Sequence, residues 1–186
     1  MYEEYLSAGM HIGVKQQTKD MKRFIYKIRD DGLAILDLQT IEKRIQIAGK
    51  FLAKFNRIIV VSRKVIGWKP VKKFAEVINA KAFTGRFLPG TITNPSFPGY
   101  HEPDVLIVTD PLADSQAIKE AVKMRIPIVA LATTTNQVTS IDLIIPVNNR
   151  GRKSVAMVYY LLAKEILKNR GEDKELKPED FQMKEK

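Results

Sequence analysis

Cysteine is absent from this chain of 186 residues, and histidine occurs only twice. Without thiols the chain forms no disulfide and offers no thiolate for catalysis or metal binding, which fits a cytoplasmic protein. His11 and His101 stand far apart and lack HxH or HxxxH spacing, which argues against a zinc site. His11, between Met10 and Ile12, is better explained as a hydrogen-bonded structural residue than as a general base.

Long apolar runs are missing too. None approaches the roughly 20 residues that a membrane-spanning helix needs. The N-terminus opens with acidic residues and lacks the hydrophobic centre of a signal peptide, so we expect neither membrane insertion nor secretion. A chain of this length can bury about 70% of its unfolded surface in one domain. We expect that domain to comprise residues 1–170.

Glycine-rich phosphate motifs do not occur either. The loops after the predicted strands hold neither GxGxxG nor GxxxxGK, on which Rossmann and P-loop sites depend. Thr133–Asn136 could hold a flavin phosphate near a helix N-terminus, but an ordinary polar turn is the better explanation. Asp110 and Asp114 could form a carboxylate pair, but Asp114 fits an N-cap and Asp110 a turn at a strand end. We therefore expect no catalytic residues, metal site or cofactor.

Positive charge, by contrast, is in excess. The chain has 31 Lys and Arg against 21 Asp and Glu, a net charge of +10. Residues 171–186 hold six acidic and four basic residues, so residues 1–170 carry +12. Such a body attracts phosphate backbones, because each neutralised phosphate releases counterions; a merely basic soluble protein is the alternative. Residues 171–186 lack strong apolar periodicity, and we expect a charged, flexible tail.

Apolar runs alternate with amphipathic stretches over most of the chain. The predicted strands are residues 58–61, 81–84, 105–108, 128–131 and 143–145, and the predicted helices are residues 39–55, 71–78, 114–122 and 154–167. Nearly continuous apolar strands connected through helices indicate a parallel sheet that is covered on both faces. Residues 85–103 contain prolines and glycines that exclude a continuous helix, so we expect a long loop there.

Residues 1–38 form an extension of a different kind. Residues 2–8 predict a short helix that ends near Gly9 and is followed by a polar, basic loop. Two strand-like runs, residues 24–29 and 33–38, flank Asp30–Gly32, which is a strong signal for a hairpin turn. The sequence therefore predicts an N-terminal helix and a β-hairpin before the main sheet.

Basic residues gather in loops that follow the predicted strands and around the hairpin. Because parallel strands end at one edge of a sheet, groups far apart in sequence can share a surface. Arginine engages two phosphate oxygens at once, and lysine adds a mobile charge. The candidates for nucleic-acid contact are Lys15, Lys19, Lys22, Arg23, Arg63, Lys64, Lys69, Lys72, Lys73, Arg86, Arg150, Arg152 and Lys153. Each alone can equally be a solvated residue, but the whole set favours RNA or DNA.

Aromatic residues are sparse among these basic groups. Trp68, Phe87, Phe97 and Tyr100 could stack on exposed bases, although burial under the long loop explains most of them. No helix-turn-helix, zinc-finger or RNP-like motif is present, so sequence-specific DNA recognition is poorly supported. Recognition of a folded RNA by its shape suits the pattern better, with non-specific DNA binding as an alternative.

A series of motifs carries a family resemblance. The segments are Ala8–Gly13, Phe24–Tyr26, Ile35–Leu38, Arg86–Leu88, Thr93–Asn94, Pro103–Asp110 with Asp114, Ile118, Glu120, Ile126 and Pro127, and Ile145–Pro146 with Asn148. In this order they resemble the S2 family of small-subunit ribosomal proteins over about residues 5–170. Val14 stands where bacterial members have a second histidine, and the short segment Pro95–Pro103 replaces their helical hairpin. With Asn148–Gly151, these features resemble an archaeal-type member.

The resemblance implies a three-layer α/β/α, flavodoxin-like fold with a central parallel sheet. It implies a structural constituent of the small ribosomal subunit that binds small-subunit ribosomal RNA and supports assembly and translation in the cytoplasm. It also implies a monomer within the ribosome that contacts neighbouring small-subunit proteins, without catalysis, cofactor, membrane or small-molecule substrate. Arg86, Thr93 and Asn94 lie in matching motifs and are further candidates for RNA contact, although such motifs can equally serve the fold. A flavin- or nucleotide-binding enzyme on the same fold is the alternative.

Overall fold

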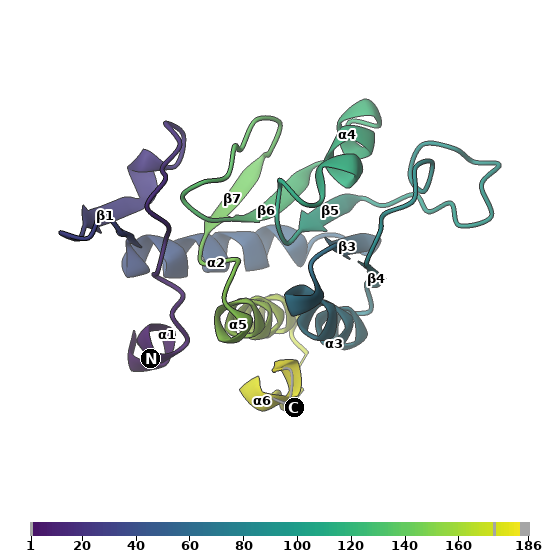
Figure 1. The fold of residues 1–186 in the computed structure, drawn as a ribbon. Helices are drawn as coiled ribbons and strands as arrows, with labels where there is room; N and C mark the ends of the chain where they lie inside the picture. The colour runs from purple at the N-terminus through teal and green to yellow at the C-terminus, as the bar shows by residue number, and fades with distance from the viewer. Residues whose placement is uncertain (1, 173, 183–186) are drawn as a thin grey trace.

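The computed structural model describes residues 2–172 and 174–182, and Figure 1 shows their arrangement. A five-stranded parallel sheet forms the centre, and its strands lie in the order β4-β3-β5-β6-β7. The strands are β3 (Ile58–Ser62), β4 (Lys81–Thr84), β5 (Val105–Val108), β6 (Ile128–Ala132) and β7 (Leu143–Pro146). This is the flavodoxin-type order, in which the chain changes direction across the sheet between the first and third strands. The predicted α/β fold class is confirmed, and the change of direction lies between β3 and β5.

Helices cover both faces of the sheet, so the three predicted layers are present (Figure 1). The helices are α2 (Leu38–Leu52), α3 (Trp68–Ile78), α4 (Ser115–Lys123) and α5 (Arg152–Arg170). Alternate residues of β3 and β5 face opposite layers: Val60 and Ile107 pack with α2, α3 and α5, whereas Val61 and Val108 pack with α4. The α4 layer is completed by Phe87 from the long loop. Among the described residues, no helix is both long and apolar enough to span a bilayer.

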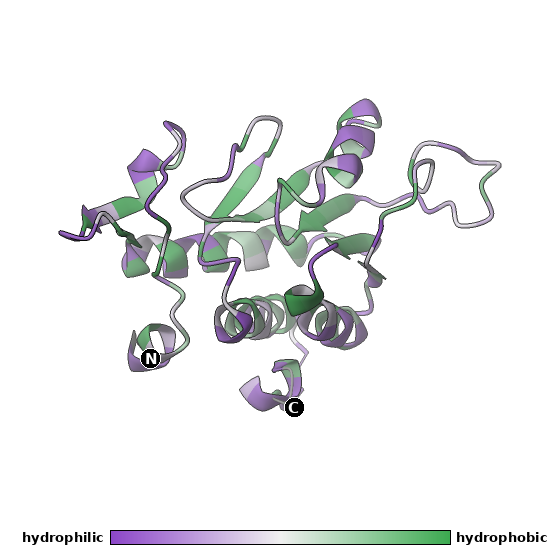
Figure 2. Ribbon diagram, in the orientation of Figure 1, coloured by the Kyte–Doolittle hydropathy of each residue, from purple (hydrophilic) through white to green (hydrophobic). Residues whose placement is uncertain are grey.

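Buried strands explain the near-continuous apolar runs in the sequence. Every residue of β3, β5 and β6 is buried, because these strands have neighbours on both sides and helices or loops on both faces. Figure 2 shows this as hydrophobic strands at the centre, with the hydrophilic residues gathered on the outer helices and loops.

The N-terminal extension has the predicted helix and hairpin. Its elements are α1 (Tyr2–Ser7), the 3₁₀ turn η1 (Lys22–Phe24), β1 (Ile25–Ile28) and β2 (Ala34–Leu36). Gly32 in the hairpin turn has φ +83°, a left-handed conformation that glycine adopts without strain. The second strand ends earlier than predicted, because Asp37 caps α2 by accepting hydrogen bonds from the N–H groups of Gln39 and Thr40.

The described part of the C-terminal segment, where we expect a flexible tail, contains one short element. It forms the short helix α6 (Pro178–Phe181), and Phe181 is completely buried with its ring 5.9 Å from that of Tyr160. Lys174 Nζ donates to the carbonyl of Val77 at 3.1 Å. A single aromatic anchor and side-chain bonds to backbone therefore hold this segment on α3 and α5. The remainder of the predicted tail, residue 173 and residues 183–186, lies outside the described residues.

Candidate nucleic-acid interface

Polar side chains fill the space at the carboxyl ends of β3, β5 and β6. Thr109 Oγ1 donates to the carbonyl of Val61 at 2.8 Å. Because its proton is used there, Thr109 Oγ1 accepts a hydrogen bond from the Tyr159 hydroxyl, 2.7 Å away. Asn149 Nδ2 donates to the carbonyl of Leu131 at 3.2 Å. Thr109, Tyr159 and Asn149 are all completely buried. In flavodoxin-like sheets this switch point is where a mononucleotide binds, but here the protein's own side chains occupy it.

Two aspartates extend this network to the surface. Asp110 accepts a hydrogen bond from Asn136 Nδ2 at 2.9 Å and forms an ion pair with Lys64. Asp114 accepts from the backbone N–H groups of Arg63, at 2.7 Å, and of Asp110, at 3.1 Å. Burial raises the pKa of Asp114 to about 6, although these two hydrogen bonds oppose the rise. Both carboxylates are therefore committed to the ends of the strands.

The predicted capping role of Asp114 is only half correct. Asp114 occupies the N-cap position of α4, but its side chain makes no capping bond. The carboxylate instead accepts hydrogen bonds from two backbone N–H groups at the ends of β3 and β5. It satisfies buried donors of the sheet rather than the first turn of a helix.

Two glycines let neighbouring segments close over the network. A Cβ added at Gly67, in the 3₁₀ turn η2 (Val65–Gly67), would collide with Ser62 Oγ at the end of β3. A Cβ at Gly13 would lie 2.6 Å from Thr134 Cγ2, after the end of β6. Real Cβ atoms do not approach so closely, so both contacts require glycine. The switch point is thus covered from the α3 side and from the N-terminal loop.

The N-terminal loop brings lysines to this edge of the sheet. The backbone N–H of Thr18 donates to the carbonyl of Thr134 at 2.9 Å. The Thr18 hydroxyl donates to the carbonyl of Asn136, also at 2.9 Å. These bonds fix the loop across the end of β6, with Lys15 and Lys19 exposed on it. The structure therefore joins these lysines to the strand-end loops, a proximity that the sequence did not predict.

Arginines follow the ends of three other strands. Gly85 N–H donates to the carbonyl of Ser62 at 2.9 Å, so Arg63 and Arg86 leave adjacent strands at the same edge. Arg150 Nη2 donates to Thr135 Oγ1 at 3.2 Å, beside the N-terminal loop. We call the exposed basic residues of this edge the carboxyl-edge surface. It comprises Lys15, Lys19, Arg63, Arg86, Arg150, Arg152 and Lys153.

The start of α5 adds to the positive potential of this surface. Arg152 and Lys153 are the first residues of the helix, and its first turn contains no acidic residue. Asn148 Oδ1 accepts from the N–H groups of Arg150 and Gly151, so the loop before the helix is ordered by its own side chain. The positive end of the helix dipole and the basic side chains therefore both favour a negatively charged ligand.

Other predicted contact residues have partners inside the protein. Lys64 pairs with Asp110, and Lys73 lies 3.2 Å from Glu76 on the same helix. Lys69 Nζ donates to the carbonyl of Gln182 and so ties α3 to the C-terminal segment. These three lysines are half-buried and are less available to an external phosphate than the carboxyl-edge surface.

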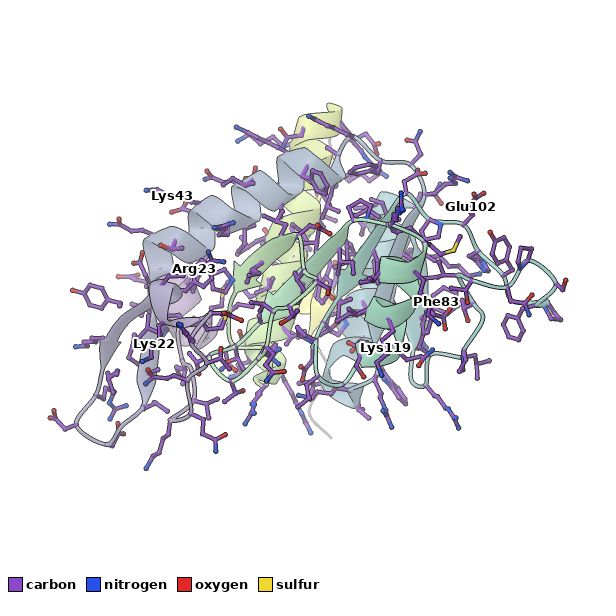
Figure 3. All side chains as sticks on the ribbon, turned by 90° about the horizontal axis from the view of Figure 1, so that it is seen from above. Lys22, Arg23, Lys43, Phe83, Glu102 and Lys119 are labelled. Atoms are coloured by element: carbon purple, nitrogen blue, oxygen red, sulfur yellow. The ribbon has the colours of Figure 1, made fainter. Side chains whose placement is uncertain are left out.

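Lys22, Arg23 and Lys72 lie elsewhere and are exposed. Figure 3 places Lys22 and Arg23 beside the N-terminal hairpin. The Arg23 guanidinium lies over the ring of Phe24, 4.8 Å from its centroid. Lys72 is in the second turn of α3. Lys22 and Arg23 therefore lie at the hairpin, and Lys72 lies on α3.

Thr93 and Asn94 belong to a loop that Glu120 organises. Glu120 is buried on α4 and accepts from the N–H groups of Gly90, at 3.0 Å, and Ile92, at 3.2 Å, and from Thr93 Oγ1 at 3.2 Å. Burial raises its pKa, but these bonds and one from Gln116 outweigh burial and hold the pKa below its usual value. Asn94 is exposed, and its Oδ1 accepts from Ser96 N–H. Thr93 therefore serves the loop in the described structure.

Several of these central residues were not predicted as functional. Glu120 falls on the same face of α4 as Ala117 and Ala121, and an acidic residue on an apolar face is a signal for a buried hydrogen-bonded carboxylate. Tyr159 likewise lies within the apolar stripe of α5, where its hydroxyl needs a partner. No pattern in the sequence indicated that Asn149 would reach across β6.

His11 is a structural residue that is hydrogen-bonded through its main chain and not through ring Nδ1. Its Nδ1 is buried and has no hydrogen-bond partner within the described residues, and burial lowers its pKa. The hydrogen bond at this position comes from the backbone, since the His11 carbonyl accepts from Leu36 N–H at 2.8 Å. The residue joins the N-terminal loop to β2 through its main chain.

Comparison with known proteins gives consistent matches. Residues 5–97 and 99–169 match the family model of ribosomal protein S2. Proteins named small ribosomal subunit protein uS2 from Staphylothermus marinus and Thermoplasma acidophilum are 55% and 56% identical over 171 residues. These alignments cover 91% of this chain and 78% and 86% of the relatives.

The uS2 protein of Haloquadratum walsbyi is 51% identical over 173 residues, or 92% of this chain. The alignment spans 62% of that relative, so this chain covers less than two thirds of its length. The flavodoxin-type strand order, the family match over nearly the whole chain and identities above 50% agree with one another. The chain belongs to the ribosomal protein S2 family.

Proposed function

We propose that this chain is a structural constituent of the small ribosomal subunit and that its carboxyl-edge surface binds small-subunit ribosomal RNA. The observation that carries the proposal is the contrast at the strand ends. The interior of the switch point is filled by Thr109, Asn149 and Tyr159, whereas arginines and lysines stand exposed around it. A polyanion larger than a nucleotide can lie across such a rim without entering the sheet.

The loops of the carboxyl-edge surface are fixed before any RNA binds. Asn148, Thr18 and Gly85 make backbone hydrogen bonds that hold the segments carrying the basic side chains. Because only the side chains remain to be ordered, binding costs less conformational entropy than the ordering of a disordered basic loop. Affinity then arises mainly from counterion release, and specificity from the fixed spacing of the cations on the folded RNA.

We further infer that the chain acts in the cytoplasm as one copy within the particle, contacts neighbouring small-subunit proteins and catalyses no reaction. Asp110 and Asp114, the two carboxylates nearest the switch point, are both occupied by hydrogen bonds or an ion pair. A flavin-binding enzyme on this fold would have to displace Tyr159 and Asn149 from the position that the cofactor needs. Absorbance of the purified protein separates the two functions, since stoichiometric flavin would contradict a purely structural role.

Sedimentation of cell extract through a sucrose gradient tests the proposed function. We expect the protein in the small-subunit fractions, together with small-subunit ribosomal RNA. A buffer that dissociates the subunit into RNA and proteins should move the protein to the top of the gradient, which controls for aggregation. If the protein stays at the top of the gradient in intact extract, the ribosomal function is contradicted.

A further inference from the structure

We propose that Trp68 is a stacking platform for an unpaired nucleobase of the bound RNA. The inference rests on the proposed function, because it names the feature of the RNA that one part of the carboxyl-edge surface recognises. Trp68 is the first residue of α3 and stands beside that surface, with 36% of its area exposed.

The indole ring is fixed between the ends of two strands. Its Nε1 donates to the carbonyl of Arg63, after β3, at 3.3 Å. On the other side its Cζ2 lies close to Gly85, after β4, where an added Cβ would be 3.8 Å away. Arg63 and Arg86 follow these two strands and are both exposed. The ring thus lies between the backbone positions that carry two exposed arginines, and its Nε1–H already has an acceptor.

The ring makes no aromatic or cation–π contact within the described chain. The cation–π contacts there involve Phe24, and the ring–ring contacts involve other aromatic residues. Phe87, the aromatic residue that follows Arg86, is 6% exposed and packs with the sheet and α4. Trp68 is therefore the aromatic residue that the carboxyl-edge surface offers to a ligand.

The surrounding chemistry selects an unpaired nucleotide. The two flanking arginines can bind phosphates, and the indole offers an apolar face on which a base can stack. Bases in a duplex are already stacked on their neighbours, so only an unpaired or bulged base can use the ring. The exposed Val65 and Leu88 would also suit an apolar protein surface. RNA is favoured because Arg63 and Arg86, on either side of the ring, are cationic. The nearby carboxylates do not neutralise them, since Asp110 pairs with Lys64 and Asp114 accepts from a backbone N–H group.

Fluorescence tests the contact directly, because Trp68 is the single tryptophan of the sequence. The full chain is titrated with refolded small-subunit ribosomal RNA and, separately, with a fully paired RNA duplex of about 20 base pairs, a length beyond the about 16 that a double-stranded-RNA domain spans. We expect strong quenching of the emission at saturation with ribosomal RNA and little change with the duplex. Unchanged emission at saturation with ribosomal RNA would overturn the proposal, whatever the variants do.

Variants test the energetic contribution. Trp68→Leu should weaken binding to ribosomal RNA about tenfold, in the range found when stacking aromatics are removed. The slope of log affinity against log salt should not change, because no charge is lost. Trp68→Phe keeps a ring and should stay within about threefold of the unsubstituted chain. Tyr26→Leu removes an exposed aromatic from the hairpin and should have no effect.

The outcomes separate this proposal from the proposed function. If the unsubstituted chain does not bind ribosomal RNA, the proposed function fails and the stacking proposal with it. If the chain binds with a steep salt slope but Trp68→Leu binds equally well, the stacking proposal alone fails. Thermal unfolding of Trp68→Leu verifies that the variant is folded, and the fluorescence titration decides the matter without any variant.

Discussion

Glu120 shows how one buried charge can order a long loop. Its two carboxylate oxygens accept four hydrogen bonds, from Gly90 and Ile92 N–H, Thr93 Oγ1 and Gln116 Nε2. The loop between β4 and β5 therefore closes around a side chain of α4. This explains how a segment without helix or strand can form part of the outer layer of the sheet.

Glu120→Gln should lower the free energy of unfolding by about 1–3 kcal/mol. The amide would turn one donor towards the N–H groups of Gly90 or Ile92, and buried donors would lose their acceptor. Urea unfolding at pH 7 measures the loss. Glu76→Gln, which changes an exposed carboxylate paired with Lys73, is the matched control and should have little effect. Equal stability of the two variants would show that Glu120 does not hold the loop.

Asp114 should make the chain less stable as the pH rises. Because burial raises its pKa from 3.8 to about 6, the folded chain binds this proton more tightly than the unfolded chain does. The resulting stability is fully present below about pH 4 and is lost as the pH rises through about 6. Over that window the free energy of unfolding should fall by about 3 kcal/mol relative to that of Asp114→Asn. Parallel curves for the two proteins would exclude the effect.

At the scale of elements, the C-terminal segment is attached through few contacts. Phe181 is buried against the helices, Lys69 holds the carbonyl of Gln182, and Lys174 holds that of Val77. Such a segment can open locally without unfolding of the sheet. Phe181 is the completely buried side chain of this attachment.

Phe181→Ala should lower the free energy of local opening by about 3 kcal/mol, because it removes that aromatic side chain. Amide hydrogen exchange should become faster in residues 174–182 while the strands keep their protection. Asp180→Ala, at an exposed neighbouring position, is the control and should leave exchange unchanged. Absence of protection in the unsubstituted segment would instead favour the flexible tail that the composition suggests.

The elements of the sheet could be read from the sequence because burial leaves a simple pattern. The apolar runs in β3, β5 and β6 coincide with strands that have neighbours on both sides. The hairpin was predictable because its turn needs the left-handed conformation of Gly32. The ends of the elements were harder to predict. The helix predicted at residues 154–167 begins at Arg152 and ends at Arg170, before Gly171.

The long-range partners of polar residues could not be read in this way. Asp114 has the sequence position of an N-cap, yet its carboxylate turns to the ends of two strands. Lys15 and Lys19 reach the sheet edge because Val14 and Thr18 bond to the loop after β6. Such contacts depend on which segments the fold brings together, and local periodicity carries no information about them.

At the scale of the whole molecule, the fold separates two properties. The sheet interior is apolar and its switch point is closed by hydrogen-bonded side chains, so the molecule offers a rigid frame there. The positive charge lies outside, in loops that the frame fixes. A surface of this kind can bind a folded RNA while the sheet itself stays unchanged.

Affinity for refolded small-subunit ribosomal RNA, measured against salt concentration, tests this account most directly. Substitution of Arg86, Arg150 and Arg152 by alanine removes three cations from the carboxyl-edge surface. The slope of log affinity against log salt should fall by about 2 in magnitude, since each lost phosphate contact contributes about 0.7–0.9. The charge-matched control replaces Lys43, Lys50 and Lys54, exposed on or just after α2. We predict an unchanged slope for this control; equal slopes for both triple variants would contradict the carboxyl-edge surface as the RNA interface.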